Sequence, residues 1–214
     1  MIRPVVLSAL LALLVPGPGL ADPRLSQRLD PGTAAEVERL VDTARTDGLP
    51  TEPLVSKALE GDAKGASSDR IVAAVRAQLA ALSEARGALG RTSSEAEMVA
   101  GAGALLAGVP RDSLARLRQS RPGKSLVVPL VVLADLVARK VPGEAAATAV
   151  LAVARAGAGD TELLRLRERV ERDIAGGMMP ANAALMRARK WAPGLRAPVS
   201  DRRPPVTSRP GTTP

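Results

Sequence analysis

The chain has 214 residues and a net charge of +8, and it contains no His, Cys, Phe or Tyr and a single Trp, Trp191. The lack of imidazole and thiol groups excludes Ser-His-Asp and Cys-His catalysis, His- or Cys-ligated metal centres and disulfide bonds. The chemistries that remain are carboxylate pairs, a Ser/Lys nucleophile, and carboxylate-bound Ca²⁺ or Mg²⁺.

A hydrophobic core with almost no aromatic residues must be built from Leu, Val, Ile, Met and Ala. These small aliphatic side chains favour helices that approach one another closely. The composition therefore predicts an all-α fold, either a multi-helix bundle or an irregular helical-hairpin array.

The first 21 residues have the pattern of a cleavable export signal peptide. Arg3 precedes an apolar run from Val5 to Val15, and a Pro/Gly segment with small residues at Gly19 and Ala21 follows. The run is too short to span a bilayer, which takes about 20 apolar residues, so cleavage is preferred to an uncleaved membrane anchor. We expect an exported protein, periplasmic or extracellular, whose mature chain begins at residue 22.

Residues 22–32 are expected to form a lead-in segment to an α-helical domain over residues 33–191. Capping-box sequences, in which a hydroxyl and a Glu cap the first helical turn reciprocally, begin at Thr33 and at Ser94. Apolar residues at three- and four-residue spacing follow both boxes, and the same spacing follows Asp69 and Asp160. Helices are predicted to begin near these four positions.

The segment from Leu126 to Val137 is apolar on nearly every side. It is too short for a transmembrane helix, and we interpret it as a central buried helix that starts between Ser125 and Pro129. Its many Val residues leave a buried strand as the alternative, although no other segment offers a strand to pair with it.

Charged residues four apart predict ion pairs along single helices. Glu168 is spaced to pair with Arg172, and Arg169 is spaced to pair with Asp173, on a solvent-exposed face. Asp135 is the only charge within the apolar segment 126–137. We expect it at a polar helix edge beside Arg139, and burial of its carboxylate is the alternative.

A recurring Gly-apolar-Pro pattern predicts tight corners between helices. Gly adopts a left-handed conformation after a helix, the apolar residue folds back onto that helix, and Pro begins the next one. Four segments have this pattern or a close variant: Gly48-Leu49-Pro50, Gly108-Val109-Pro110, Lys140-Val141-Pro142 and Gly177-Met178-Met179-Pro180. Their irregular spacing favours separate helical hairpins over a strict repeat array.

The strongest candidate binding site lies at the C-terminal end of the chain. Residues 192–214 are rich in Pro and Arg and are predicted to be a disordered tail. Together with the preceding helix end, the tail has many cations and one aromatic residue, which suit an anionic lipid or polysaccharide surface. Nucleic acid is a less expected ligand, because only one aromatic residue is available to stack on bases. The candidate residues are Arg187, Arg189, Lys190, Trp191, Arg196, Arg202, Arg203 and Arg209. The structural alternative is a solvated helix end with Trp191 packed over the last corner.

Four further patterns resemble functional motifs without completing them. Gly123-Lys124-Ser125 lacks the first Gly of a phosphate-binding loop, and the run Gly101 to Ala104 lacks the third Gly of a dinucleotide fingerprint. We expect an inter-helix loop and a small-residue helix contact, respectively. Glu60 and Asp62 are the one carboxylate pair expected in a loop, and the adjacent pairs Ser56-Lys57 and Lys124-Ser125 do not suit a nucleophile and its base. We therefore predict no catalytic residue, no cofactor site and no metal site.

The leading hypothesis from these observations is a non-enzymatic exported protein whose helical hairpins bind a protein partner or serve a structural role in the cell envelope. The alternative is a peripheral protein that binds anionic envelope surfaces through its basic tail. An enzyme that uses only carboxylates or a Ser/Lys pair is the third hypothesis, and it requires a pocket with two converging carboxylates.

Overall fold

The computed structural model describes residues 22–195, and it confirms the prediction of an all-helical protein. These residues form ten α-helices and no strand. In chain order they are α1 (Pro23–Arg28), α2 (Pro31–Thr46), α3 (Glu52–Ala63), α4 (Ser68–Leu89), α5 (Glu95–Leu106), α6 (Arg111–Ser120), α7 (Val127–Ala138), α8 (Gly143–Arg155), α9 (Asp160–Ala175) and α10 (Pro180–Ala188). The predicted signal peptide and most of the predicted tail lie outside the described residues.

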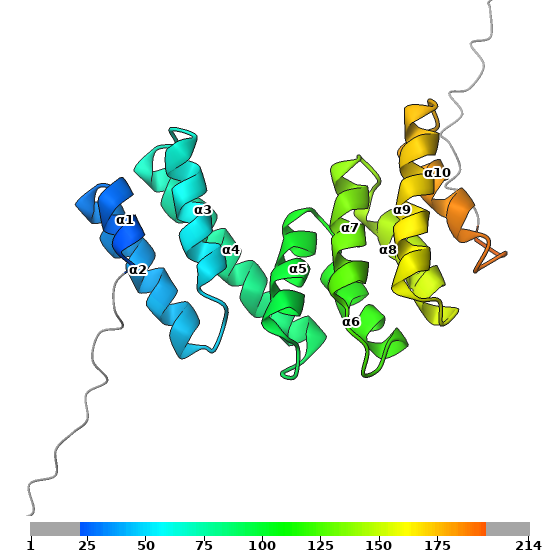
Figure 1. Cartoon of the computed structure of the whole chain (residues 1–214), viewed down its shortest axis with the longest axis horizontal. Coiled ribbons are helices and arrows are strands. Elements are labelled where there is room, and N and C mark those ends of the chain that lie inside the picture. The colour runs from blue at the N-terminus through cyan, green and yellow to red at the C-terminus, as the bar shows by residue number, and fades with distance from the viewer. Residues whose placement is uncertain (1–21, 196–214) are drawn as a thin grey trace, which may run out of the picture.

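The helices are stacked in two layers along one long axis (Figure 1). The even-numbered helices pack in sequence, α2 on α4, α4 on α6, α6 on α8 and α8 on α10. In the odd-numbered layer α1 packs on α3, and α5, α7 and α9 pack side by side, but α3 and α5 have almost no contact. The central helix α4 packs against α2 and α3 on one side and α5 and α6 on the other. The first and last helices lie at opposite ends of the array.

The predicted corners between helices are present. Gly48, Gly108 and Gly177 have φ values of 66°, 101° and 91°, and Lys140 takes the same left-handed conformation at 67°. At each corner the next amide donates back to a carbonyl five residues earlier, as Leu49 does to Ala44 at 2.8 Å. This is the Schellman arrangement, which satisfies carbonyl groups at the helix end.

The N-terminal segment, predicted as a lead-in, contains a short helix. Residues 23–28 form α1, whose Leu25 is fully buried, and α2 begins at Pro31, two residues before Thr33. The prediction of a capping box at Thr33 is wrong, because Asp30 is the cap residue and accepts the Thr33 amide at 3.0 Å. Asp30 is a favoured cap residue and Pro31 is favoured at the first helical position, so the helix is capped about one turn before Thr33.

The capping box at Ser94 is confirmed, and its Glu97 also connects neighbouring helices. Ser94 Oγ accepts the Glu97 amide at 3.2 Å, and Glu97 Oε2 accepts the Ser94 amide at 3.0 Å. Glu97 Oε1 accepts the amide of Leu126, just before α7, at 2.8 Å, and Oε2 lies 2.8 Å from Arg118 Nη2 of α6. One buried carboxylate therefore joins the start of α5 to α6 and α7.

Two glycines permit close contacts between helices. Gly101 of α5 is buried, and a Cβ there would lie 3.0 Å from Ala85 Cβ and 3.0 Å from Leu89 Cδ1. A Cβ on Gly143, at the start of α8, would lie 2.2 Å from the carbonyl oxygen of Gly108. The predicted small-residue contact at Gly101 is confirmed, whereas Gly103 is exposed. The segment 126–137 is helical, as α7, and not a strand.

Candidate interaction surface

The described part of the C-terminal basic cluster is engaged in contacts within the protein. Arg187 donates from Nε and Nη2 to the two Asp173 oxygens, each at 2.6 Å. This bidentate contact lowers the pKa of Asp173 below its ordinary value. Asp173 therefore pairs with Arg187 of α10, and the prediction that it pairs with Arg169 is wrong.

The neighbouring residues attach the end of the fold to α8 and α9. Lys190 Nζ lies 3.6 Å from Glu162 Oε2 and 5.0 Å from the ring centroid of Trp191. Arg189 Nε donates to the carbonyl of Leu195 at 3.0 Å. Trp191 and Leu195 pack on the core, so this part of the predicted tail belongs to the folded array. The candidate residues Arg196, Arg202, Arg203 and Arg209 lie outside the described residues.

An exposed apolar face, which we name the apolar strip, crosses three helices of the odd-numbered layer. Its largest side chains are exposed by 39% at Val99, 49% at Leu106, 41% at Val131 and 38% at Leu164. The strip is completed by three smaller exposed residues: Ala96 and Gly103 of α5 and Ala138 of α7. On α5 the exposed positions 96, 99, 103 and 106 recur at helical spacing and include no polar side chain.

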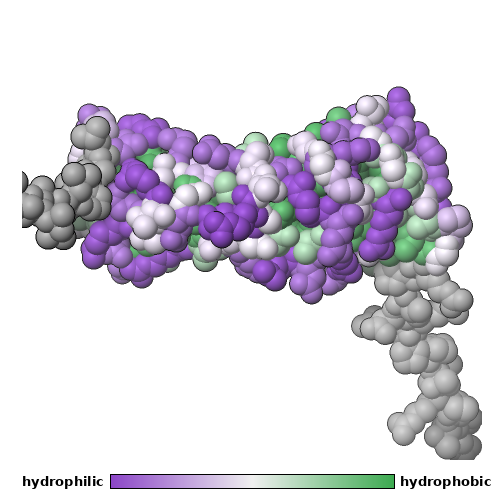
Figure 2. All heavy atoms as spheres, turned by 90° about the horizontal axis from the view of Figure 1, so that it is seen from below, coloured by the Kyte–Doolittle hydropathy of each residue, from purple (hydrophilic) through white to green (hydrophobic). Residues whose placement is uncertain are grey.

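The three helices present the strip in register. Val99, Val131 and Leu164 each lie four residues after the first residue of their helix. Helices α5, α7 and α9 run in the same direction (Figure 1) and neighbours pack together, so these exposed side chains occupy corresponding positions on adjacent helices. On the face seen from below in Figure 2, hydrophobic residues lie mainly in the central and right-hand parts of the array, whereas the left-hand end is mainly hydrophilic.

Polar groups lie beside and within the strip. The neighbouring helix α3 exposes Glu52, Ser56 and Glu60. Arg167 of α9 donates to Asp135 of α7 at 2.8 Å, and this ion pair joins two helices of the strip itself. The predicted pairing of Asp135 with Arg139 is therefore wrong, and Arg139 pairs instead with Glu171 of α9 at 2.6 Å. Exposed apolar side chains together with polar groups are usual in protein-binding surfaces.

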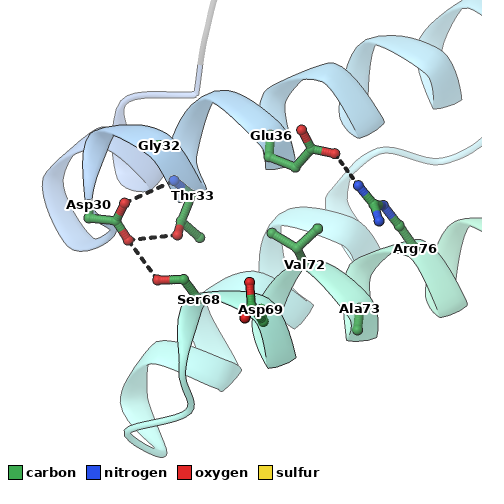
Figure 3. A pocket seen from close by; sticks show the side chains of 9 residues that line it. All are labelled: Asp30, Gly32, Thr33, Glu36, Ser68, Asp69, Val72, Ala73 and Arg76. Atoms are coloured by element: carbon green, nitrogen blue, oxygen red, sulfur yellow. Dashed lines mark hydrogen bonds and ion pairs between the residues drawn. The ribbon is translucent and has the colours of Figure 1, made fainter.

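A polar hollow of about 520 Å³ lies between α2 and α4. Figure 3 shows that Asp30 and Glu36 point into it and that both are engaged by neighbouring groups. Asp30 accepts Thr33 Oγ1 at 2.6 Å and Ser68 Oγ at 2.9 Å, and Glu36 pairs with Arg76 of α4. These contacts fasten the start of α2 to α4, and we assign the hollow a structural role.

Replacement of Asp30 by Ala is expected to lower the melting temperature by about 2–4 °C at pH 7, because the cap of α2 and its link to Ser68 are lost. Hydrogen bonds from Thr33 lower the pKa of Asp30 to about 2, below the ordinary value of 3.8. The stabilisation is thus complete above the ordinary pKa and is lost as the pH falls through the folded value. Melting curves of both proteins from pH 6 to pH 2 should converge in acid; a constant difference would contradict the cap.

The remaining motif-like patterns lie in helix ends and connecting loops. Glu60 and Asp62 lie in the last turns of α3 and not in a loop, where Glu60 pairs with Lys57 and Lys64 and Asp62 pairs with Arg28. The Gly123 segment is an inter-helix loop after a helix, as expected. Within residues 22–195 there is no cluster of three or more carboxylates able to hold a metal ion.

None of the helices in the described part of the chain is both long and apolar enough to cross a membrane. Comparisons of the chain with family models, with curated proteins and with solved structures found no significant match.

Proposed function

We propose that this is a non-enzymatic interaction protein of the cell envelope, which binds a protein partner through the apolar strip on α5, α7 and α9. The observation that carries the proposal is the exposure of Val99, Val131 and Leu164 at corresponding positions of three neighbouring helices. Covering such a row removes apolar surface from water, which is the main driving force of protein association. The pattern of the first 21 residues supports an exported location.

The proposal is tested by capture of partners from an envelope extract on the immobilised protein. The strip variants Val131→Glu and Leu106→Glu should retain at least tenfold less partner than the parent protein, because a buried unpaired carboxylate opposes association. Both positions are solvent-exposed, so stability should change by less than about 0.5 kcal/mol. The matched control is Gln119→Glu, which adds the same charge on the exposed face of α6. Unchanged retention by both strip variants would overturn the proposal.

Binding of anionic envelope surfaces through the basic tail remains the second candidate function. The same capture experiment distinguishes it from binding of a protein partner through the apolar strip. The charges from Arg196 to Arg209 support it, whereas Arg187 and Lys190 are already close to carboxylates. A variant that ends at Leu195 keeps the residues that pack on the core. Capture that requires the tail and disappears at high salt would favour the anionic surface, since counterion release makes such binding strongly salt-dependent.

A further inference from the structure

Two adjoining hollows lie along α8, on the even-numbered layer of the array. One, of about 350 Å³, is lined by Arg116 of α6, by Leu151 and Arg155 of α8 and by Trp191. The other, of about 370 Å³, is lined by Pro142, Ala145, Ala181 and Leu185, with Glu144 at its edge. Thr148 and Leu195 line both hollows, so the two adjoin, and we name them together the groove. Volumes of this size are typical of small-ligand sites.

The two ends of the groove differ in charge. Arg116 and Arg155 lie at one end, and neither guanidinium forms an ion pair with a carboxylate among residues 22–195. Arg116 donates only to the carbonyl of Asp112 and to Ser113 Oγ, within its own helix. Glu144 lies at the other end, eleven residues and about 16 Å along the helix from Arg155. The groove thus attracts an anionic group at one end and repels it at the other.

Between the two ends the lining side chains are almost all apolar. The one uncharged polar side chain along the groove is the Thr148 hydroxyl, and the other uncharged residues are Ala, Leu, Pro and Trp. An extended peptide would find only this hydroxyl as a side-chain partner for amide and carbonyl groups that face the lining there, and each group left unpaired would carry a desolvation cost. A hydrocarbon chain has no such groups. The lining therefore favours an acyl chain over a peptide backbone.

We infer that the groove binds a free single-chain carboxylate of the fatty-acid type, with its carboxylate between Arg116 and Arg155 and its chain directed past Thr148 toward Leu185. Two guanidinium groups that line the same hollow suit a carboxylate, which accepts hydrogen bonds through both oxygens. Leu195 lines both hollows, and Trp191 lines the one that contains the two arginines. This site is separate from the apolar strip and does not depend on the function proposed for it.

The chain carries its own reporter for this inference, because Trp191 is its only aromatic residue and lines the groove. Titration of the purified protein with laurate, below the concentration at which laurate forms micelles, should give a saturable change in Trp191 emission. Dodecyltrimethylammonium, which has the same chain length and a cationic head, should give none. The double variant R116Q/R155Q should bind laurate at least tenfold more weakly. The control R169Q/R172Q removes the same charge from exposed positions on α9 and should bind like the parent.

Three results would overturn the inference. The first is no saturable change with laurate, or equal affinity for the anionic and cationic amphiphiles. The second is an effect with a free-carboxylate peptide such as Ala-Leu-Leu-Leu and none with laurate, which would identify a peptide site. The third is an effect only with phosphatidylglycerol vesicles, which would identify a membrane surface. The strip variant Val131→Glu should retain laurate binding, so that failure here is distinguishable from failure of the proposed function.

Discussion

Replacement of Glu97 by Ala is expected to lower the free energy of unfolding by about 3 kcal/mol, a value typical of breaking a buried, hydrogen-bonded ion pair. The variant loses the acceptor for the Ser94 and Leu126 amides and the partner of Arg118. Both amides lie at helix starts, where no intrahelical carbonyl replaces the lost acceptor. Urea unfolding measures the loss, and hydrogen exchange should locate it at the starts of α5 and α7.

Two further variants serve as comparisons for Glu97→Ala. Glu97→Gln retains one carbonyl oxygen, so it satisfies one of the two amides and should have an intermediate effect. Glu84→Ala removes an exposed carboxylate 3.8 Å from Arg111, and it should change stability by less than about 0.5 kcal/mol. If Glu97→Ala were no more harmful than Glu84→Ala, the assigned role of Glu97 in joining the helices would be wrong.

Acid should weaken the same contact. Burial raises the pKa of Glu97, but hydrogen bonds from the Leu126 and Ser94 amides and the charge of Arg118 outweigh it, so the pKa lies below the ordinary value of 4.5. The stabilisation is therefore complete above that value and is lost progressively below it. The difference in stability between the parent protein and Glu97→Gln should shrink as the pH is lowered from 6 to 3.

Replacement of Gly143 by Ala is expected to destabilise the protein by about 2–3 kcal/mol, although an alanine in a helix is normally preferred to glycine. The new Cβ would lie 2.2 Å from the Gly108 carbonyl oxygen and 3.4 Å from Pro110 Cδ. The Gly108 oxygen is a backbone atom in a tight corner and cannot rotate away. Removal of the clash therefore requires α8 to move away from the α5–α6 connection. Urea unfolding gives the magnitude, and faster hydrogen exchange in α6 and α8 should show the displacement.

Gly103→Ala is the matched control for this steric argument. Gly103 is also helical, but nothing lies within 4 Å of a Cβ built there. The substitution should therefore stabilise the protein by about 0.5–1 kcal/mol through reduced freedom of the unfolded chain. The two substitutions are expected to have opposite signs. A stabilising Gly143→Ala would show that the close approach of α8 to the corner is not required.

Local signals in the sequence predicted local structure well. The Gly-apolar-Pro corners and the Ser94 capping box depend on residues close in the chain, and the structure confirms them. The six-residue helix α1 was missed, because its one fully buried residue, Leu25, leaves no apolar periodicity to detect. The ion pairs of Asp135 and Asp173 were assigned to the wrong partners, since Arg167 and Arg187 are brought to them only by packing between helices.

The two candidate binding surfaces were beyond the reach of sequence patterns for a related reason. In α5 and α7 most positions are apolar, so periodicity does not distinguish the buried face from the exposed one that contains Val99 and Val131. Arg116 and Arg155 have the sequence context of ordinary solvated helix residues. Arg116 and Arg155 line the same groove only because the fold brings together α6, α8 and the C-terminal turn, which the sequence does not reveal.

The near absence of contact between α3 and α5 determines how the two ends of the array are connected. Within residues 22–195, close packing between the α1–α3 stack and the rest of the array passes through α4 alone. A pulling force applied to the two ends would therefore be transmitted across the width of one helix rather than across two layers. A change in the tilt of α4 would alter the distance between the first and last helices. The orientation of α4 relative to the helices on its two sides therefore sets how far the array extends.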